Sequence, residues 1–99
     1  MQPSKILAEI VLERVASLHS AWQLTNGASQ LERKFEFSGY PKAVYLTNLC
    51  IWLSEKTKHH ADISFGWGYV IVRLTTHDVE GLSELDFDWA QRLDKLLED

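Results

Sequence analysis

Three of the four histidines lie close together in the 99-residue sequence, at His59, His60 and His77. Each is expected at the boundary of a helix or strand, where a side chain can meet a ligand while the scaffold holds it in place. An imidazole exchanges its proton near neutral pH, so this grouping favours general acid/base chemistry. The sequence therefore indicates a site for proton transfer.

Two acidic residues stand at spacings that could serve these histidines. Glu55 precedes His59 by four residues, which places both on one face if the helix extends that far, and the helix C-terminus would favour a charged imidazole. Asp86 closes the S-E-L-D motif of residues 83–86, which fits a capping box. Taken alone, each has a simpler structural role, an exposed ion pair for Glu55 and a helix cap for Asp86.

Other kinds of catalytic site are disfavoured. Three histidines and a carboxylate could in principle bind zinc, but adjacent histidines cannot easily place both rings on one ion, and no H-x-x-x-H or C-x-x-C unit is present. Cys50 lies in an apolar run typical of a buried thiol, and no serine stands in a G-x-S-x-G elbow. We therefore expect neither a metal nor a bound cofactor.

Composition narrows the class of protein further. A chain of 99 residues with 45% hydrophobic residues suits one domain over residues 1–99, and a domain this small commonly gains stability by self-association. The net charge of -4 argues against direct binding of nucleic acid. A single cysteine, no signal peptide pattern and no apolar run of about 20 residues predict a soluble cytoplasmic protein without a membrane segment.

The periodicity of apolar residues predicts the elements that must position these side chains. Helical spacing is expected over residues 4–18, 42–58 and from residue 83 to the C-terminus, and alternation typical of strands over residues 22–25, 30–37, 63–67 and 69–76. This α-β-β-α-β-β-α order predicts an α+β fold, a single domain with a four-stranded antiparallel sheet and three helices on one face.

The segments E-K-T-K-H-H at residues 55–60 and T-H-D-V-E-G-L-S-E-L-D at residues 76–86 form a larger pattern. With Trp67 standing for an aromatic residue between them, they resemble the pterin-4a-carbinolamine dehydratase family. Trp22, the F-x-F strand and the helix after it extend the resemblance over nearly the whole chain. Two departures stand out: Ala61 replaces a common proline, which predicts a less rigid turn, and Ile63 replaces a common tryptophan.

The resemblance implies removal of water from a 4a-hydroxytetrahydropterin to give a quinonoid dihydropterin. Loss of water requires one proton delivered to the departing hydroxyl and another removed from the adjacent ring nitrogen, which two imidazoles can do. By resemblance, His59 and His77 form the acid/base pair, His60 orients the ligand, and Glu55 and Asp86 tune them. The implied catalytic residues are His59, His60, His77 and Asp86; the implied pterin contacts are Glu55, His59, His60, Ala61, Trp67, Thr76, His77, Asp78 and Val79.

The resemblance also bears on partners. It implies a homodimer or homotetramer and a functional link to an aromatic amino acid hydroxylase, with the pterin as substrate rather than cofactor. An alternative is a non-catalytic module that binds a pterin or acts as a dimerisation partner of a transcription factor. Loss of turnover on replacing His59 or His77 distinguishes the dehydratase from this alternative.

Overall fold

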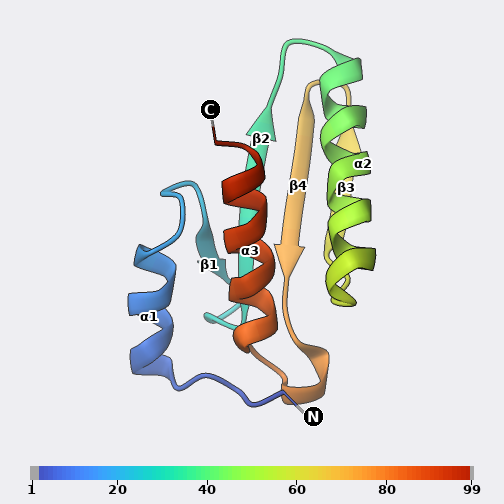
Figure 1. Cartoon of the computed structure of the whole chain (residues 1–99). Helices are drawn as coiled ribbons and strands as arrows, with labels where there is room; N and C mark the ends of the chain where they lie inside the picture. The colour runs from blue at the N-terminus through green and yellow to red at the C-terminus, as the bar shows by residue number, and fades with distance from the viewer. Residues whose placement is uncertain (1–2, 99) are drawn as a thin grey trace.

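The computed structural model describes residues 3–98, and its centre is a single antiparallel sheet (Figure 1). The strands are β1 (Gln23–Thr25), β2 (Gln30–Glu36), β3 (Asp62–Gly66) and β4 (Tyr69–Leu74). Their order is β1-β2-β4-β3, with every neighbouring pair antiparallel. The predicted four-stranded antiparallel sheet is confirmed.

Alternation along the strands separates an inner from an outer face. Val70, Val72 and Leu74 of β4 are buried, and Leu31 of β2, paired with Leu74, is fully buried as well. Residues at alternate positions, such as Lys34, are exposed on the opposite face. Because side chains alternate between the faces of a strand, this pattern places the core on one side of the sheet.

Three helices complete the domain: α1 (Ala8–Ala16), α2 (Tyr40–Thr57) and α3 (Glu84–Leu96). In Figure 1, α2 and α3 lie in front of the sheet, and α1 lies beside α3 near β1. The predicted α-β-β-α-β-β-α order is confirmed. The helix predicted over residues 4–18 begins later, because the N–H of Ile6 donates to the carbonyl of Leu82 at 2.8 Å in an extended segment.

Helix α2, like α3, contributes buried residues to the core. Pro41 stands in its first turn, where the missing N–H has no helical partner to lose. Ala43, Cys50 and Leu53 are buried in the core. Desolvation raises the pKa of the Cys50 thiol to about 12, so this cysteine is the inert buried thiol that its apolar surroundings predicted.

The segment between β4 and α3 differs in detail from the sequence prediction. β4 ends at Leu74, Thr76 pairs with Gly81 in an isolated bridge, and His77–Val79 form a short 3-10 helix, η1. The strand predicted over residues 69–76 therefore ends two residues early, and His77 lies in η1. Within residues 3–98, none of the helices has the length and hydrophobicity to cross a bilayer.

Candidate active site

The predicted histidines meet at one end of the sheet, where α2 ends and α3 begins. A cavity of about 310 Å³ opens there, lined by Pro3, Lys58, His59, His60, Thr75, Thr76, His77, Asp78 and Leu85. His59 and His60 reach it from the turn after α2, whereas His77 and Asp78 reach it from the start of η1. Antiparallel pairing of β3 with β4 brings these two chain segments together.

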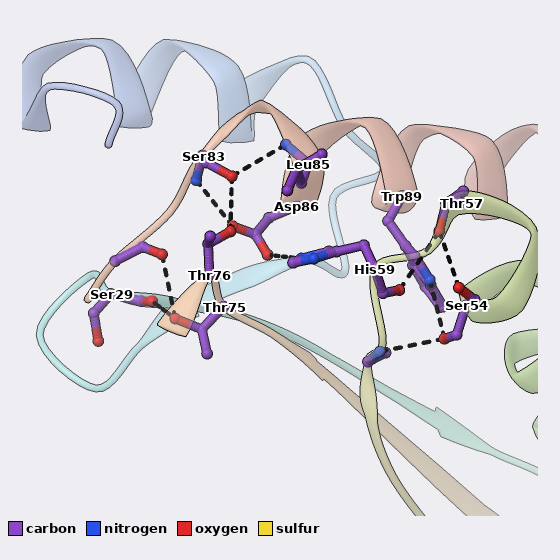
Figure 2. A network of polar contacts seen from close by, with 12 residues as sticks. Ser29, Ser54, Thr57, His59, Thr75, Thr76, Ser83, Leu85, Asp86 and Trp89 are labelled. Atoms are coloured by element: carbon purple, nitrogen blue, oxygen red, sulfur yellow. Dashed lines mark hydrogen bonds and ion pairs between the residues drawn. The ribbon is translucent and has the colours of Figure 1, made fainter. Parts of the chain in front are cut away.

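The carboxylate of Asp86 contacts the ring of His59 (Figure 2). The carboxylate is fully buried, and its Oδ1 lies 2.6 Å from Nε2 of His59, whose side chain is 12% exposed. Its Oδ2 accepts hydrogen bonds from Thr76 Oγ1 at 2.7 Å and from the N–H of Ser83 at 2.9 Å. Each carboxylate oxygen is therefore satisfied, as burial of a charge requires.

The local cause of this placement is the capping box at the start of α3. Ser83 is the N-cap, its hydroxyl accepts from the N–H of Leu85, and Asp86 accepts from the N–H of Ser83. The capping role expected from the S-E-L-D motif is confirmed. The same carboxylate also holds His59, so the two roles of Asp86 are compatible.

The contact with Asp86 determines which nitrogen of His59 remains for chemistry. A carboxylate only accepts hydrogen bonds, so Nε2 of His59 must carry the proton in their short contact. This leaves Nδ1 as the nitrogen that can take a proton from a ligand or return it. A histidine oriented in this way by a buried carboxylate is a common device in acid/base sites.

The pairing predicted between Glu55 and His59 is wrong. The Glu55 carboxylate instead contacts His60, at 2.5 Å between Oε2 and Nε2, and both side chains are largely exposed. The reason is that α2 ends at Thr57 and Lys58 adopts the left-handed conformation, with φ of 56°. His59 therefore leaves the helical face that carries Glu55, and Glu55 does not line the cavity.

Trp67, which the resemblance implies as a pterin contact, does not line the cavity that the histidines share. Trp67 follows β3 in the turn of the β3–β4 hairpin, whereas His59 and His60 precede β3. An antiparallel strand rises about 3.4 Å per residue, so the length of β3 separates them. Trp67 instead lines a groove on the sheet with Lys34, Glu36 and Tyr69 among its neighbours.

The remaining predicted residues lie at or beside the cavity. Thr76 is buried, contributes to the lining of the cavity and donates a hydrogen bond from its hydroxyl to Asp86. Asp78 is exposed at its rim, while Ala61 and Val79 are partly buried next to lining residues without lining it themselves. The sequence reasoning did not identify four lining residues. They are Pro3, Lys58, Thr75 and Leu85.

These four residues carry different amounts of sequence signal. Lys58 directly precedes the histidine pair, and Leu85 lies inside the capping motif, so proximity to the motifs could have indicated both. Pro3 comes from the opposite end of the chain, and its position depends on the contact between Ile6 and Leu82. Within the described range 3–98, no three His, Cys, Asp or Glu side chains are arranged to hold a metal ion.

The fold and the cavity together define an α+β domain with three histidines on the wall of one small cavity. The sequence pattern of the pterin 4 alpha carbinolamine dehydratase family matches residues 4–96, so the chain belongs to this family, which consists of hydro-lyases.

Relatives with known names agree with this assignment. A protein of Alkaliphilus metalliredigens, provisionally named a pterin-4-alpha-carbinolamine dehydratase, is 41% identical over 82% of this chain and 72% of its own length. A Paracoccus denitrificans protein with the same provisional name is 40% identical over 74% of this chain and 68% of its own.

Two solved structures share the fold. The transcriptional coactivator/pterin dehydratase of Brucella melitensis superimposes with a TM-score of 0.86 over 96% of this chain and all of its own, at 24% identity. A pterin dehydratase-like protein described as a RuBisCO assembly factor in the alpha-carboxysome gives a TM-score of 0.66 over 79% of this chain and 90% of its own, at 29% identity. The first likeness concerns the fold alone.

Proposed function

We propose that this protein removes water from a 4a-hydroxytetrahydropterin to give a quinonoid dihydropterin. The observation that carries the proposal is the cavity in which His59, anchored by buried Asp86, and His77 both face one ligand-sized space. Its volume of about 310 Å³ lies at the lower end of the range for small-molecule pockets, which suits a compact bicyclic substrate. Membership of the dehydratase family supports the same conclusion.

The reaction needs two proton transfers, and the site offers two imidazoles for them. One histidine donates a proton to the 4a-hydroxyl, so that the C–O bond breaks and water leaves. The other removes the proton from the adjacent ring nitrogen, whose electrons form the new C=N bond. The proton balance is zero over the cycle, and no electrons leave the substrate. The chemistry therefore requires neither a metal nor a redox cofactor.

The two histidines stand in different surroundings. His59 is mostly buried and held by Asp86, whereas His77 is exposed at the start of η1. We assign them jointly as the acid/base pair. His60, on the cavity wall and paired with Glu55, orients the pterin, and Thr76 and Asp78 contribute polar groups to the same wall. Asp86 positions the ring of His59, and its negative charge would stabilise the imidazolium when His59 carries a second proton.

The proposal extends to assembly and cellular setting. Large side chains on α2 remain exposed, including Tyr45, Ile51 and Trp52, and apolar surface of this kind favours a homodimer or homotetramer. A cytoplasmic protein that works alongside an aromatic amino acid hydroxylase would meet its substrate as that enzyme releases it. Analytical ultracentrifugation checks the assembly, with a monomer at micromolar concentration as the contradicting result.

The test of the activity compares histidine variants in a dehydration assay followed by ultraviolet absorbance. We expect His59→Ala and His77→Ala each to lower the rate at least about a hundredfold while circular dichroism shows an unchanged fold. His19→Asn serves as the control, because His19 lies away from the cavity and its Nδ1 only accepts from the N–H of Ala21. Equal rates in all variants would refute the histidine assignment.

A second candidate function is a non-catalytic pterin-binding or assembly module. It is favoured by the structural relatives described as a transcriptional coactivator and a RuBisCO assembly factor. Quenching of tryptophan fluorescence by a dihydropterin, without acceleration of dehydration, would support pterin binding alone. A stable protein complex that survives loss of His59 and His77 would support the assembly role.

A further inference from the structure

Ser54 does not line the cavity, but it accepts hydrogen bonds from the backbone at the first histidine of the pair and at the residue directly after the second. Its side chain is buried near the end of α2, with the residue 4% exposed. Its carbonyl accepts the N–H of His59 at 3.2 Å, and its hydroxyl oxygen accepts the N–H of Ala61 at 3.2 Å. One residue therefore holds the backbone at the start of the histidine pair and immediately after it.

Helix α3 connects Ser54 to the rest of the site. The indole N–H of Trp89 donates to the same Ser54 hydroxyl oxygen at 3.3 Å, and Trp89 is fully buried. Trp89 follows Asp86 by three residues, so both side chains extend from one side of α3, as residues at this spacing do. Figure 2 shows the result: Asp86 holds the ring of His59, while Trp89 holds Ser54 and through it the backbone.

The histidine turn has few other restraints. His59 and His60 lie between the end of α2 at Thr57 and the start of β3, outside any regular element. β3 is an edge strand and pairs with β4 alone. Lys58, which begins the turn, has φ of 56° without being glycine, a conformation that non-glycine residues keep only where the surroundings enforce it.

We propose that Ser54 is a positioning residue for dehydration, acting through the backbone of Ala61 and His59 to fix the histidine pair against Asp86 and the cavity. The inference rests on the proposed function. Ser54 touches no substrate and transfers no proton. Its hydroxyl oxygen has two lone pairs, which is the number that the Ala61 and Trp89 donors require.

Replacing Ser54 with alanine removes the acceptor for both donors. In Ser54→Ala we expect a fall of about tenfold in kcat/KM per folded molecule, because small misalignments of catalytic groups carry large costs in rate. We also expect faster hydrogen exchange at the Ala61 amide, since its N–H loses its partner. If Ser54→Ala does not fold, Ser54→Cys provides the same comparison, because sulfur accepts hydrogen bonds only weakly.

The decisive variant is the double change Ser54→Ala with Ala61→Pro. Proline has no N–H and fixes its own φ, so it removes the donor that Ser54 satisfies and stiffens the turn by another route. We expect this double variant to recover kcat/KM to within about threefold of the original protein. The control is Thr47→Val, which removes a second buried hydroxyl from α2, one without a hydrogen-bond partner among residues 3–98. Its turnover should not change.

The outcomes separate a positioning role for Ser54 from a purely structural one. An active original protein with unchanged kcat/KM and Ala61 exchange in Ser54→Ala would overturn the inference. Activity that simply follows the folded fraction, with no rescue by proline, would assign Ser54 a structural role only and would overturn it as well. If the original protein does not accelerate dehydration, the proposed function fails first, and the Ala61 exchange rate still shows whether Ser54 restrains the turn.

Discussion

Asp86→Asn is the substitution that most sharply separates an oriented histidine from a helix cap. The amide keeps the size of the carboxylate but has only one accepting oxygen. That oxygen can remain with Thr76 and Ser83, which both donate to Oδ2, and the NH₂ group then faces Nε2 of His59. A donor in that position forces His59 into the other tautomer, with the proton on Nδ1. The nitrogen available to the substrate is then no longer a base.

The magnitude follows from the number and kind of bonds. The buried carboxylate makes three charge-assisted hydrogen bonds; in the amide the bonds from Thr76 and Ser83 become weaker, and the one with His59 reverses its direction. Each change costs about 1 kcal/mol, and part of the sum is offset because the variant no longer buries a charge. We expect a net loss of about 2 kcal/mol in the free energy of unfolding, seen as a fall of about 10 °C in Tm. Turnover should fall by at least about a hundredfold, as expected when a catalytic histidine takes the wrong tautomer.

A matched control is available on the same helix. Asp94 also accepts three hydrogen bonds, from Arg33 at 2.8 Å, from the Trp22 indole at 2.8 Å and from the N–H of His19 at 2.9 Å, but it lies away from the cavity. Asp94→Asn should lower Tm to a similar degree and leave turnover per folded molecule unchanged. Turnover of Asp86→Asn within twofold of the original, measured well below Tm, would refute the reasoning.

Three further predictions concern stability. Burial raises the pKa of Cys50 from 9.0 to about 12, so as the pH rises the thiol ionises first in the unfolded chain. The free energy of unfolding, measured with urea, should therefore fall between about pH 9 and 12 more steeply in the original protein than in Cys50→Ala. Equal dependence on pH in the two proteins would contradict this. Gly68→Ala should lower the free energy of unfolding by about 1–3 kcal/mol, since Gly68 has φ of 81° and an added Cβ would lie 2.9 Å from the Phe37 carbonyl oxygen. Calorimetry should show this as a lower Tm, and an unchanged Tm would contradict it. Thr47→Val should keep or raise Tm, because the buried hydroxyl of Thr47 has no hydrogen-bond partner in the described part of the chain; a lower Tm would contradict this.

The sheet and its helices were predictable because their signals are local. The alternation in residues 30–37 and the apolar spacing in α3 each follow from burial on one side of an element. The capping box was predictable for the same reason, since Ser83 and Asp86 satisfy each other within a single helical turn. Local patterns of this kind predict which elements form, although their ends differ: the first helix begins at Ala8 rather than at residue 4, and β4 ends at Leu74 rather than at residue 76.

The predictions that the structure does not follow concern the end of a helix and the register of a hairpin. The i, i+4 argument for Glu55 and His59 assumed a helix through residue 59, and the left-handed conformation of Lys58 ended it. The resemblance implies Trp67 as a pterin contact, but the hairpin register carries it to the end of β3 away from the histidines. Neither conformation nor register is visible in the residue types alone.

The turn at Ala61 is also restrained by a contact that the sequence does not reveal. The alanine in place of proline predicted a less rigid turn, yet its N–H donates to Ser54, which itself accepts from Trp89 of α3. A serine inside an apolar helix and a tryptophan 35 positions away give no combined signal in the sequence. Only the packed structure shows that the two residues meet behind the histidine turn.

The central claim is that this cavity catalyses dehydration with its histidines. The most direct measurement is the ultraviolet-monitored dehydration of freshly generated 4a-hydroxytetrahydropterin by the intact protein and by His77→Ala, each against the uncatalysed background. The account predicts clear acceleration by the intact protein and a near-background rate for the variant. A background rate from well-folded intact protein would contradict the account and favour a binding role instead.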